Sequence, residues 1–212
     1  MEANLKKTLL MSATVFALFS WMGLTGGPTS ASPVHVADNV VVDAPKLTPG
    51  DTWTWTGSIG RTETFVGKEG DLLAFRMGPK KTKYRTAELN FVKDVDSDGK
   101  VLNFRDPHAG LLSFPLYVGK KWERKYSSSL TKASDRYASF EVKEYREVST
   151  EAGKFMAFVI VVNDIGQKEF THFSGTYYYA PDVKNIVHYA ARAVRDNKPF
   201  GEYDLKSYKL KN

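Results

Sequence analysis

The stretch "DTWTWTG" at 51–57 alternates threonine with tryptophan over its central residues. Successive side chains of a β-strand point to opposite faces, so this alternation predicts a strand with Trp53 and Trp55 on one face. Beyond the N-terminal segment, no window sustains the spacing of an amphipathic helix over three turns. The chain is therefore expected to be all-β, an antiparallel barrel, half-barrel or sandwich of about ten or more strands.

Three later segments predict strands of different kinds. Residues 136–148 alternate and then slip by one position near Tyr145, which indicates a β-bulge. Residues 153–164 are apolar on both faces and predict a central strand that is buried on both sides. Residues 185–196 could form one helical face, but their Ile-Val start favours a strand.

An internal repeat relates the two halves of the chain. Both halves share a Leu, Gly and Trp at the same spacing: Leu47, Gly50 and Trp53, then Leu116, Gly119 and Trp122. Each half continues with an Ala-Phe strand, at 72–77 and 155–161, and with a hairpin, at 89–104 and 177–189. This order predicts two weakly repeated halves.

The N-terminus has the order of an export signal. Lys6 and Lys7 precede an apolar run that ends at Leu24, and small residues follow up to Ala31. The run is shorter than the roughly 20 residues of a spanning helix, which favours cleavage over a membrane anchor. We expect a cleaved signal peptide (1–31), a linker (32–48) and a single antiparallel β domain (49–212). The mature protein would be periplasmic or extracellular, without a membrane span.

Composition excludes several kinds of chemistry. The chain contains no cysteine, so disulfides, thiolate zinc sites, iron–sulfur clusters, cysteine nucleophiles and a lipid anchor on cysteine are not expected. No glycine-rich phosphate loop is present, and no cofactor is predicted. The formal net charge is +6, with Lys and Arg scattered except in "PKKTKYR" at 79–85. That scatter argues against nucleic acid as a partner and leaves an anionic envelope component or an apolar ligand.

The acidic stretch "KDVDSDGKV" at 93–101 begins like a calcium loop. Asp94, Asp96 and Asp98 are the only metal candidates, and they are weak ones, because the twelfth position from Asp94 is Arg105 rather than a glutamate. The Asp98-Gly99 pair instead favours a hairpin turn. The alternative reading predicts that residues 94 to 100 form an exposed connection whose carboxylates face water.

No catalytic residue is predicted. The four histidines, His35, His108, His172 and His188, show no metal-ligand spacing, and no Gly-x-Ser-x-Gly elbow occurs. A hairpin centred near residue 183 would place Tyr178 opposite His188, and His172 near Val194.

Aromatic side chains are the candidate ligand contacts. The candidates are Trp53, Trp55, Trp122 and Tyr178. Tyr177 and Tyr179 share a strand face, and Tyr178 points the other way. The alternative is that these aromatics only fill the core, as aromatic residues in strands commonly do.

The motifs together resemble a group of exported bacterial proteins of unknown function. The shared features are a Gly-Asp/Lys-x-Trp strand, "FPLYVGKKW" (114–122), "EAGKFMAF" (151–158), "YYYAPDV" (177–183) and "YDLKSYKL" (203–210). The resemblance spans about residues 47 to 210. It implies an antiparallel β fold of barrel or half-barrel type in the cell envelope, and it carries no catalytic residues. After Val183 the chain departs from the expected turn glycine, and Asn185 is expected to take the left-handed conformation.

Three functions are consistent with these features. The first is non-enzymatic binding of an apolar or amphipathic ligand, or of a protein partner, by an exported envelope protein. The second is hydrolysis of an envelope polymer by a carboxylate pair drawn from Glu141, Glu144 and Glu147. The third is a structural or assembly role through strand edges.

Overall fold

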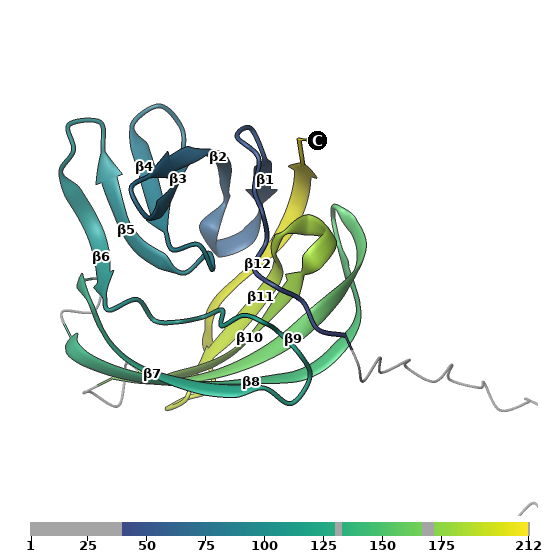
Figure 1. Cartoon of the computed structure of the whole chain (residues 1–212). Helices are drawn as coiled ribbons and strands as arrows, with labels where there is room; N and C mark the ends of the chain where they lie inside the picture. Colours follow the sequence, from purple (N-terminus) through teal and green to yellow (C-terminus); the bar gives the residue numbers. More distant parts are fainter. Residues whose placement is uncertain (1–39, 130–132, 167–171, 212) are drawn as a thin grey trace, which may run out of the picture. The chain divides into compact units, whose positions relative to one another are not determined.

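The structure is a computed structural model that describes residues 40–129, 133–166 and 172–211. The predicted signal peptide and His35 lie outside these residues. In the described part of the chain, twelve strands form one closed antiparallel barrel in which neighbours in sequence are neighbours in space and β12 returns to pair with β1 (Figure 1). The strands are β1 (Thr52–Trp55), β2 (Arg61–Glu69), β3 (Leu72–Arg76), β4 (Lys81–Arg85), β5 (Phe91–Asp96), β6 (Val101–Asp106), β7 (Lys121–Ser128), β8 (Ala133–Thr150), β9 (Gly153–Ile165), β10 (Phe173–Ala180), β11 (Asn185–Ala193) and β12 (Pro199–Lys209). The all-β antiparallel prediction is confirmed.

Helical structure in the described residues is limited to short turns such as η1 (Gly57–Ile59) and η4 (Pro181–Val183). No described helix has the length and apolar character needed to cross a membrane.

The alternation in β1 places tryptophan inside the barrel. Trp53 is completely buried and Trp55 is 3 % exposed. Their indole N–H groups donate to buried backbone carbonyls, Trp53 to Val183 at 2.8 Å and Trp55 to Ile186 at 2.9 Å. The indoles therefore satisfy their polar atoms while filling the interior, and they tie β1 to η4 and to β11, which is two strands away in the barrel.

The long strands β8 and β9 form the longest pairing in the barrel. Their register shifts between Val142 and Glu144, so the predicted bulge is confirmed. In β9 the four consecutive residues from Ala157 to Ile160 are all buried. The predicted burial on both faces is confirmed for Ala157 to Ile160, because Val159 is covered on the outer face while Phe158 and Ile160 point inward.

The hairpin of β10 and β11 has the predicted register. Tyr178 pairs with His188, and the backbone N–H of Val194 donates to the carbonyl of His172 at 3.0 Å. The turn between the strands differs from the expectation at one position. Lys184 takes the left-handed conformation, with φ of 59°, whereas Asn185 begins β11.

The two halves predicted from the repeat are β1–β6 and β7–β12. Gly50 and Gly119 precede the first strand of each half, and both have positive φ, 99° and 91°. The Ala-Phe pairs lie in β3 and β9, the third strand of each half. The hairpins do not correspond, because β5–β6 is the fifth and sixth strand of its half and β10–β11 is the fourth and fifth.

The two halves meet at the β1–β12 pairing and at a short seam between β6 and β7, where the described residues pair at Arg105–Ser128 and Asp106–Ser127. The long connection between these strands packs against the barrel (Figure 1). Leu112 and Leu116 of this connection are 2 % and 0 % exposed. Leu116 exchanges two backbone hydrogen bonds with Val42, at 3.0 and 2.8 Å, so the described part of the N-terminal segment packs here as well.

Candidate functional site

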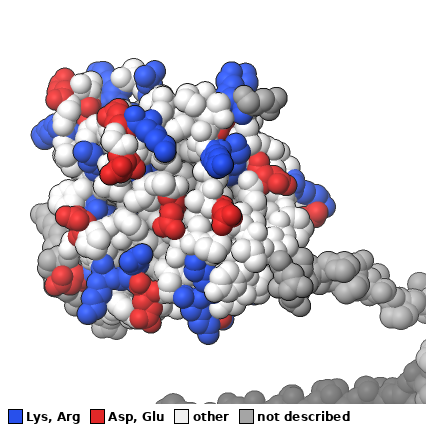
Figure 2. Space-filling model, viewed as in Figure 1, with Lys and Arg blue, Asp and Glu red and all other residues white. Residues whose placement is uncertain are grey.

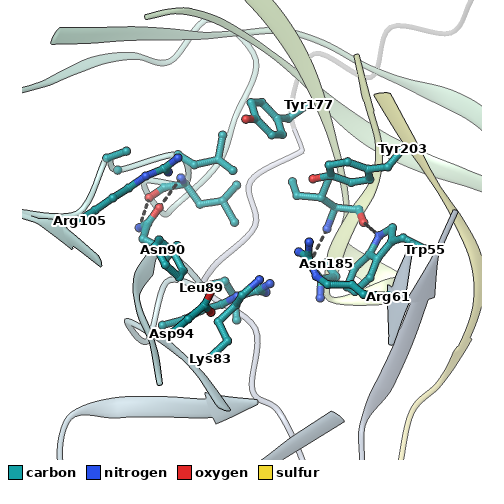
Figure 3. Close-up of a pocket in the computed structure, with 17 residues that line it drawn as sticks. Trp55, Arg61, Lys83, Leu89, Asn90, Asp94, Arg105, Tyr177, Asn185 and Tyr203 are labelled. Carbon is teal, nitrogen blue, oxygen red and sulfur yellow. Dashed lines mark hydrogen bonds between the residues drawn. The ribbon is translucent and has the colours of Figure 1, made fainter. Parts of the chain in front are cut away.

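The barrel contains a cavity of about 360 Å3. It lies among β1, β2, β4–β6, the β6–β7 connection and the inner faces of β10–β12. Figure 3 shows side chains from these elements surrounding an open space. The lining consists of Trp55, Arg61, Lys83, Arg85, Leu89, Asn90, Phe91, Asp94, Arg105, Ala109, Gly110, Leu111, Leu112, Tyr177, Asn185, Ile186 and Tyr203. A volume of this size suits a small organic molecule.

A group of buried charges forms one wall of the cavity. Glu63 in β2 is completely buried and pairs with three cations. Its Oε1 lies 2.5 Å from Nε of Arg61 and 2.7 Å from Nζ of Lys83, and its Oε2 lies 2.5 Å from Nη2 of Arg85. The strand registers explain the cluster, because residues two apart in β2 and in β4 face the interior together.

Burial and attraction act against each other at Glu63. Burial alone would raise the pKa of this carboxyl, but attraction to Arg85, Lys83 and Arg61 outweighs burial and lowers its pKa well below the ordinary range. The pKa of Lys83 is lowered to about 8, chiefly by burial, with repulsion from Arg85 and Arg61 adding to the effect and Glu63 opposing it. The cluster thus holds a permanent carboxylate and a lysine that can lose its proton in mildly basic solution.

Arg105 enters the cavity from β6. Its guanidinium carbon lies 5.6 Å from the ring centre of Phe91 and 5.5 Å from that of Tyr126. Its Nε is buried without a hydrogen-bond partner, and within the described residues Arg105 forms no ion pair. Cation–π contacts with the two rings stabilise the guanidinium.

A second buried network lies behind Arg105. The hydroxyl of Tyr126 donates to Asp164, and Nη2 of Arg136 lies 2.7 Å from Oδ1 of the same carboxylate. Burial, together with Asp164, raises the pKa of Tyr126 to about 12 although Arg105 opposes the shift. The carboxylate of Asp164 is thus already engaged by its own partners.

Aromatic rings form the opposite wall. Tyr177 and Tyr189 stack with ring centres 4.3 Å apart, Tyr189 and Tyr203 lie at 5.1 Å, and Tyr203 meets Trp55 edge-on at 6.4 Å. In Figure 3, Tyr177 and Tyr203 lie across the open space from Lys83 and Asp94. Burial raises the pKa of Tyr177 well above its ordinary value, so this wall is uncharged and largely apolar.

Two buried asparagines, Asn90 and Asn185, line the remaining sides of the cavity. Asn90, 1 % exposed, donates from Nδ2 to the carbonyl of Leu112 at 2.8 Å and accepts its N–H at 2.9 Å. This pair holds the β6–β7 connection against the cavity. Asn185 is 3 % exposed and accepts the N–H of Ile186 through Oδ1, while its Nδ2 is buried without a hydrogen-bond partner.

The structure separates the aromatic residues that the sequence suggested as ligand contacts. Only Trp55 lines the cavity. Trp53 is fully buried in the core, and Trp122 stacks on Phe140 with ring centres 5.2 Å apart while donating to the carbonyl of Gly110 at 2.6 Å. Tyr178 accepts from Arg146 at 3.2 Å and packs against His188 on the outer surface.

The aspartates of the acidic stretch at 93–101 lie in two different environments. Asp94 is 6 % exposed and pairs with Lys81 at 2.8 Å inside the barrel, so the expectation that it faces water is wrong. The physical reason is register: Asp94 lies opposite Lys83 in β4, on the interior face. Asp96 accepts the N–H groups of Asp98 and Lys100 at 3.0 and 2.9 Å, as a turn residue does. No group of three or more His, Asp or Glu side chains that could hold a metal occurs in the described part of the chain.

The carboxylates considered for hydrolysis lie away from the cavity. Glu141 is 2.6 Å from Lys143, Glu144 is 3.0 Å from Arg146, and Glu147 is 2.9 Å from Lys154. All three carry partly or largely exposed side chains. Each is engaged with a neighbouring cation at the barrel surface, and none lines the cavity.

The face of the barrel drawn in Figure 2 shows no comparable separation of charge. Figure 2 shows Lys and Arg interspersed with Asp and Glu over the visible face of the barrel. Four cations, in contrast, line the cavity together. Sequence reasoning missed Arg61, Lys83 and Arg85 as site residues because charged residues in strands are ordinarily placed outside. A signal was available in β2, where Glu63 and Arg61 stand two and four residues before Phe65, an aromatic residue that a strand would bury on the same face.

No protein-family model matches the chain, and no curated protein matches it. Several solved structures are similar, among them these three. A predicted lipoprotein from Parabacteroides distasonis is 12 % identical, with 81 % of this chain and 100 % of that chain covered and a TM-score of 0.41. The hypothetical lipoprotein YmcC from Escherichia coli is 12 % identical, with 78 % and 85 % covered and a TM-score of 0.48. A predicted exported protein with a YmcC-like fold from Bacteroides fragilis is 14 % identical, with 80 % and 100 % covered and a TM-score of 0.40.

Proposed function

We propose that this protein is an exported protein of the cell envelope that binds a small amphipathic molecule inside its barrel, without catalysing a reaction. The observation that carries the proposal is the cavity of about 360 Å3 inside the closed barrel, which is lined by both aromatic and charged side chains. Ligand sites in proteins are typically concave, mainly apolar and supplied with a few placed polar groups.

Export is supported by the N-terminal sequence. The order of basic, apolar and small residues up to Ala31 is that of a secretory signal. The protein secreted or released from the periplasm should therefore begin near Ser32. N-terminal sequencing that finds Met1 intact on the exported protein would contradict this part of the proposal.

The binding part is tested by filling the cavity. Ala109 is 7 % exposed and lines the cavity, so Ala109→Trp places an indole in the space a ligand would use. Tyr117, which is 44 % exposed in the same connection, provides the matched control Tyr117→Trp. The neutral fluorescent probe N-phenylnaphthylamine should bind wild type and the control, with binding lost in Ala109→Trp. Absence of binding to folded wild type, or equal binding to all three, would contradict the proposal.

A further inference from the structure

The barrel interior carries more positive than negative charge. Four cavity-lining residues are cations, Arg61, Lys83, Arg85 and Arg105, and one, Asp94, is an acid. The charges that pair with them do not restore balance, because Glu63 serves three of the cations and Asp94 is already paired with Lys81. When the partners Glu63 and Lys81 are counted as well, the interior holds five cations and two carboxylates. The cations are Arg61, Lys81, Lys83, Arg85 and Arg105, and the carboxylates are Glu63 and Asp94.

An uncompensated charge in such a setting is costly. Charges removed from water lose hydration, and the loss is offset only by opposite charge and hydrogen bonds close by. The exterior could have carried these cations at little cost. Their position in the interior, held by the pairing of β2, β4, β5 and β6, indicates that an anion completes the site.

Three buried polar atoms of cavity-lining residues have no hydrogen-bond partner: one acceptor, Oδ1 of Asp94, whose other oxygen pairs with Lys81, and two donors. Nε of Arg105 and Nδ2 of Asn185 are both buried and without a hydrogen-bond partner. Asn185 cannot turn this nitrogen toward the backbone, because its Oδ1 is occupied by the N–H of Ile186. Figure 3 shows Arg105 and Asn185 at different sides of the same open space. Since buried donors are nearly always paired, these two predict acceptor atoms on the ligand.

The remaining lining is apolar and defines the rest of the ligand. Leu89, Leu111, Leu112 and Ile186 contribute aliphatic surface, and Tyr177 and Tyr203 contribute ring faces. A bare inorganic anion would leave this surface uncovered.

We infer that the occupant of the cavity is an amphipathic oxyanion, a molecule with a carboxylate or phosphate head and an apolar body, whose head is held by Arg105 and the neighbouring cations. This inference rests on the proposed function and specifies its ligand class. A carboxylate or phosphate supplies both the negative charge and the several acceptor atoms that guanidinium and amide donors require. An ammonium head would be repelled, and an uncharged alcohol would leave the excess charge unpaired.

Isothermal titration with ligands of one chain length and different heads tests the inference. Octanoate and octyl phosphate should bind at least about tenfold more tightly than octanol, and octyltrimethylammonium should not bind. A tenfold change corresponds to about 1.4 kcal/mol, which is less than many charge-assisted hydrogen bonds contribute. Inorganic phosphate should bind more weakly than octyl phosphate. If inorganic phosphate binds as tightly as octyl phosphate, the amphipathic part of the inference is wrong.

Single-residue variants test which side chains bind the charged head of the ligand. Arg105→Gln should weaken octanoate binding at least about tenfold, because it removes the unpaired cation, while N-phenylnaphthylamine binding is retained. Arg76→Gln, at an exposed position in β3, is the matched control and should bind like wild type. Asn185→Asp keeps the side-chain shape but places a negative charge at the unpaired donor, so it should also lose octanoate and retain the neutral probe. It keeps the test decisive if Arg105→Gln does not fold.

Different results would contradict the anion inference and the proposed binding function. If octanoate, octanol and the neutral probe bind wild type equally, and Arg105→Gln changes nothing, the cavity binds ligands but the anion inference is overturned. If neither the probe nor any octyl ligand binds folded wild type, the proposed function itself fails.

Discussion

The ammonium nitrogen of Lys83 lies 2.7 Å from Oε1 of Glu63, and both side chains are buried in the interior of the barrel. Glu63 also holds Arg61 and Arg85, so one carboxylate neutralises part of the charge of three cations. The interior is thereby stable enough to keep its cations in place and still retains an excess of positive charge.

Replacing Glu63 with glutamine should destabilise the fold strongly. The amide keeps the volume but leaves three cations without a counter-charge in the interior, and breaking a buried ion pair from one side costs about 3–5 kcal/mol. Chemical denaturation measures the change. Glu69→Gln, at an exposed position of the same strand, is the control and should change stability by less than about 0.5 kcal/mol. Equal, small effects at both positions would contradict the buried cluster.

Lys83 should make stability rise between pH 8 and 10. Its folded pKa is lowered to about 8 from 10.5, so the unfolded chain binds more protons in this window and stability increases as pH rises. The groups facing Lys83 are Glu63, Arg61, Arg85 and Asp94. The gain at pH 10 should be about 2 kcal/mol for wild type and absent in Lys83→Met. A wild-type stability that is flat or falls over this window would refute the assignment.

Val159 should tolerate no charge. It is 5 % exposed on the outer face of β9, opposite Tyr178 in β10. Val159→Asp would bury an unpaired carboxylate there, and we expect a loss of roughly 4 kcal/mol. The control Val194→Asp places the same group at a position that is 58 % exposed. Similar melting temperatures for the two variants would show that the outer face of β9 is not covered.

Asp94 and Asp98 should respond differently to replacement by asparagine. Asp94→Asn removes the charge that pairs with Lys81 inside the barrel, and we expect a loss of about 1–2 kcal/mol. Asp98 is exposed in the turn, so Asp98→Asn should stay within about 0.5 kcal/mol. Thermal melts of both variants decide the point, and an unaffected Asp94→Asn variant would restore the reading of the whole stretch as a solvated turn.

The fold class could be predicted from the sequence because strand alternation reports directly on which residues share a face. The inward position of Trp53 and Trp55, the bulge in β8 and the pairing of Tyr178 with His188 all follow from local pattern. Closure of the sheet could not be predicted in this way. It depends on β1 pairing with β12, across nearly the whole described chain, and local pattern carries no information about such distant pairing.

The residues of the candidate site were harder to predict from the sequence, for a related reason. The run "PKKTKYR" is a visible basic cluster in the sequence, yet nothing local shows that Lys83 and Arg85 point inward. That direction follows from their pairing with Phe75 and Leu73 of β3, which is a tertiary fact. Asp94 was misplaced for the same reason, since its hairpin context favours a solvated turn and its partner Lys81 lies on another strand.

The most direct measurement is a crystal structure with octanoate that carries bromine on its terminal carbon, located by anomalous scattering. The account predicts one strong bromine position inside the barrel, near the apolar lining at Leu112 and Tyr177, with the carboxylate at Arg105. Bromine found only on the outer surface, or an interior that holds water alone in crystals saturated with the ligand, would contradict the claim that the barrel binds an amphipathic anion.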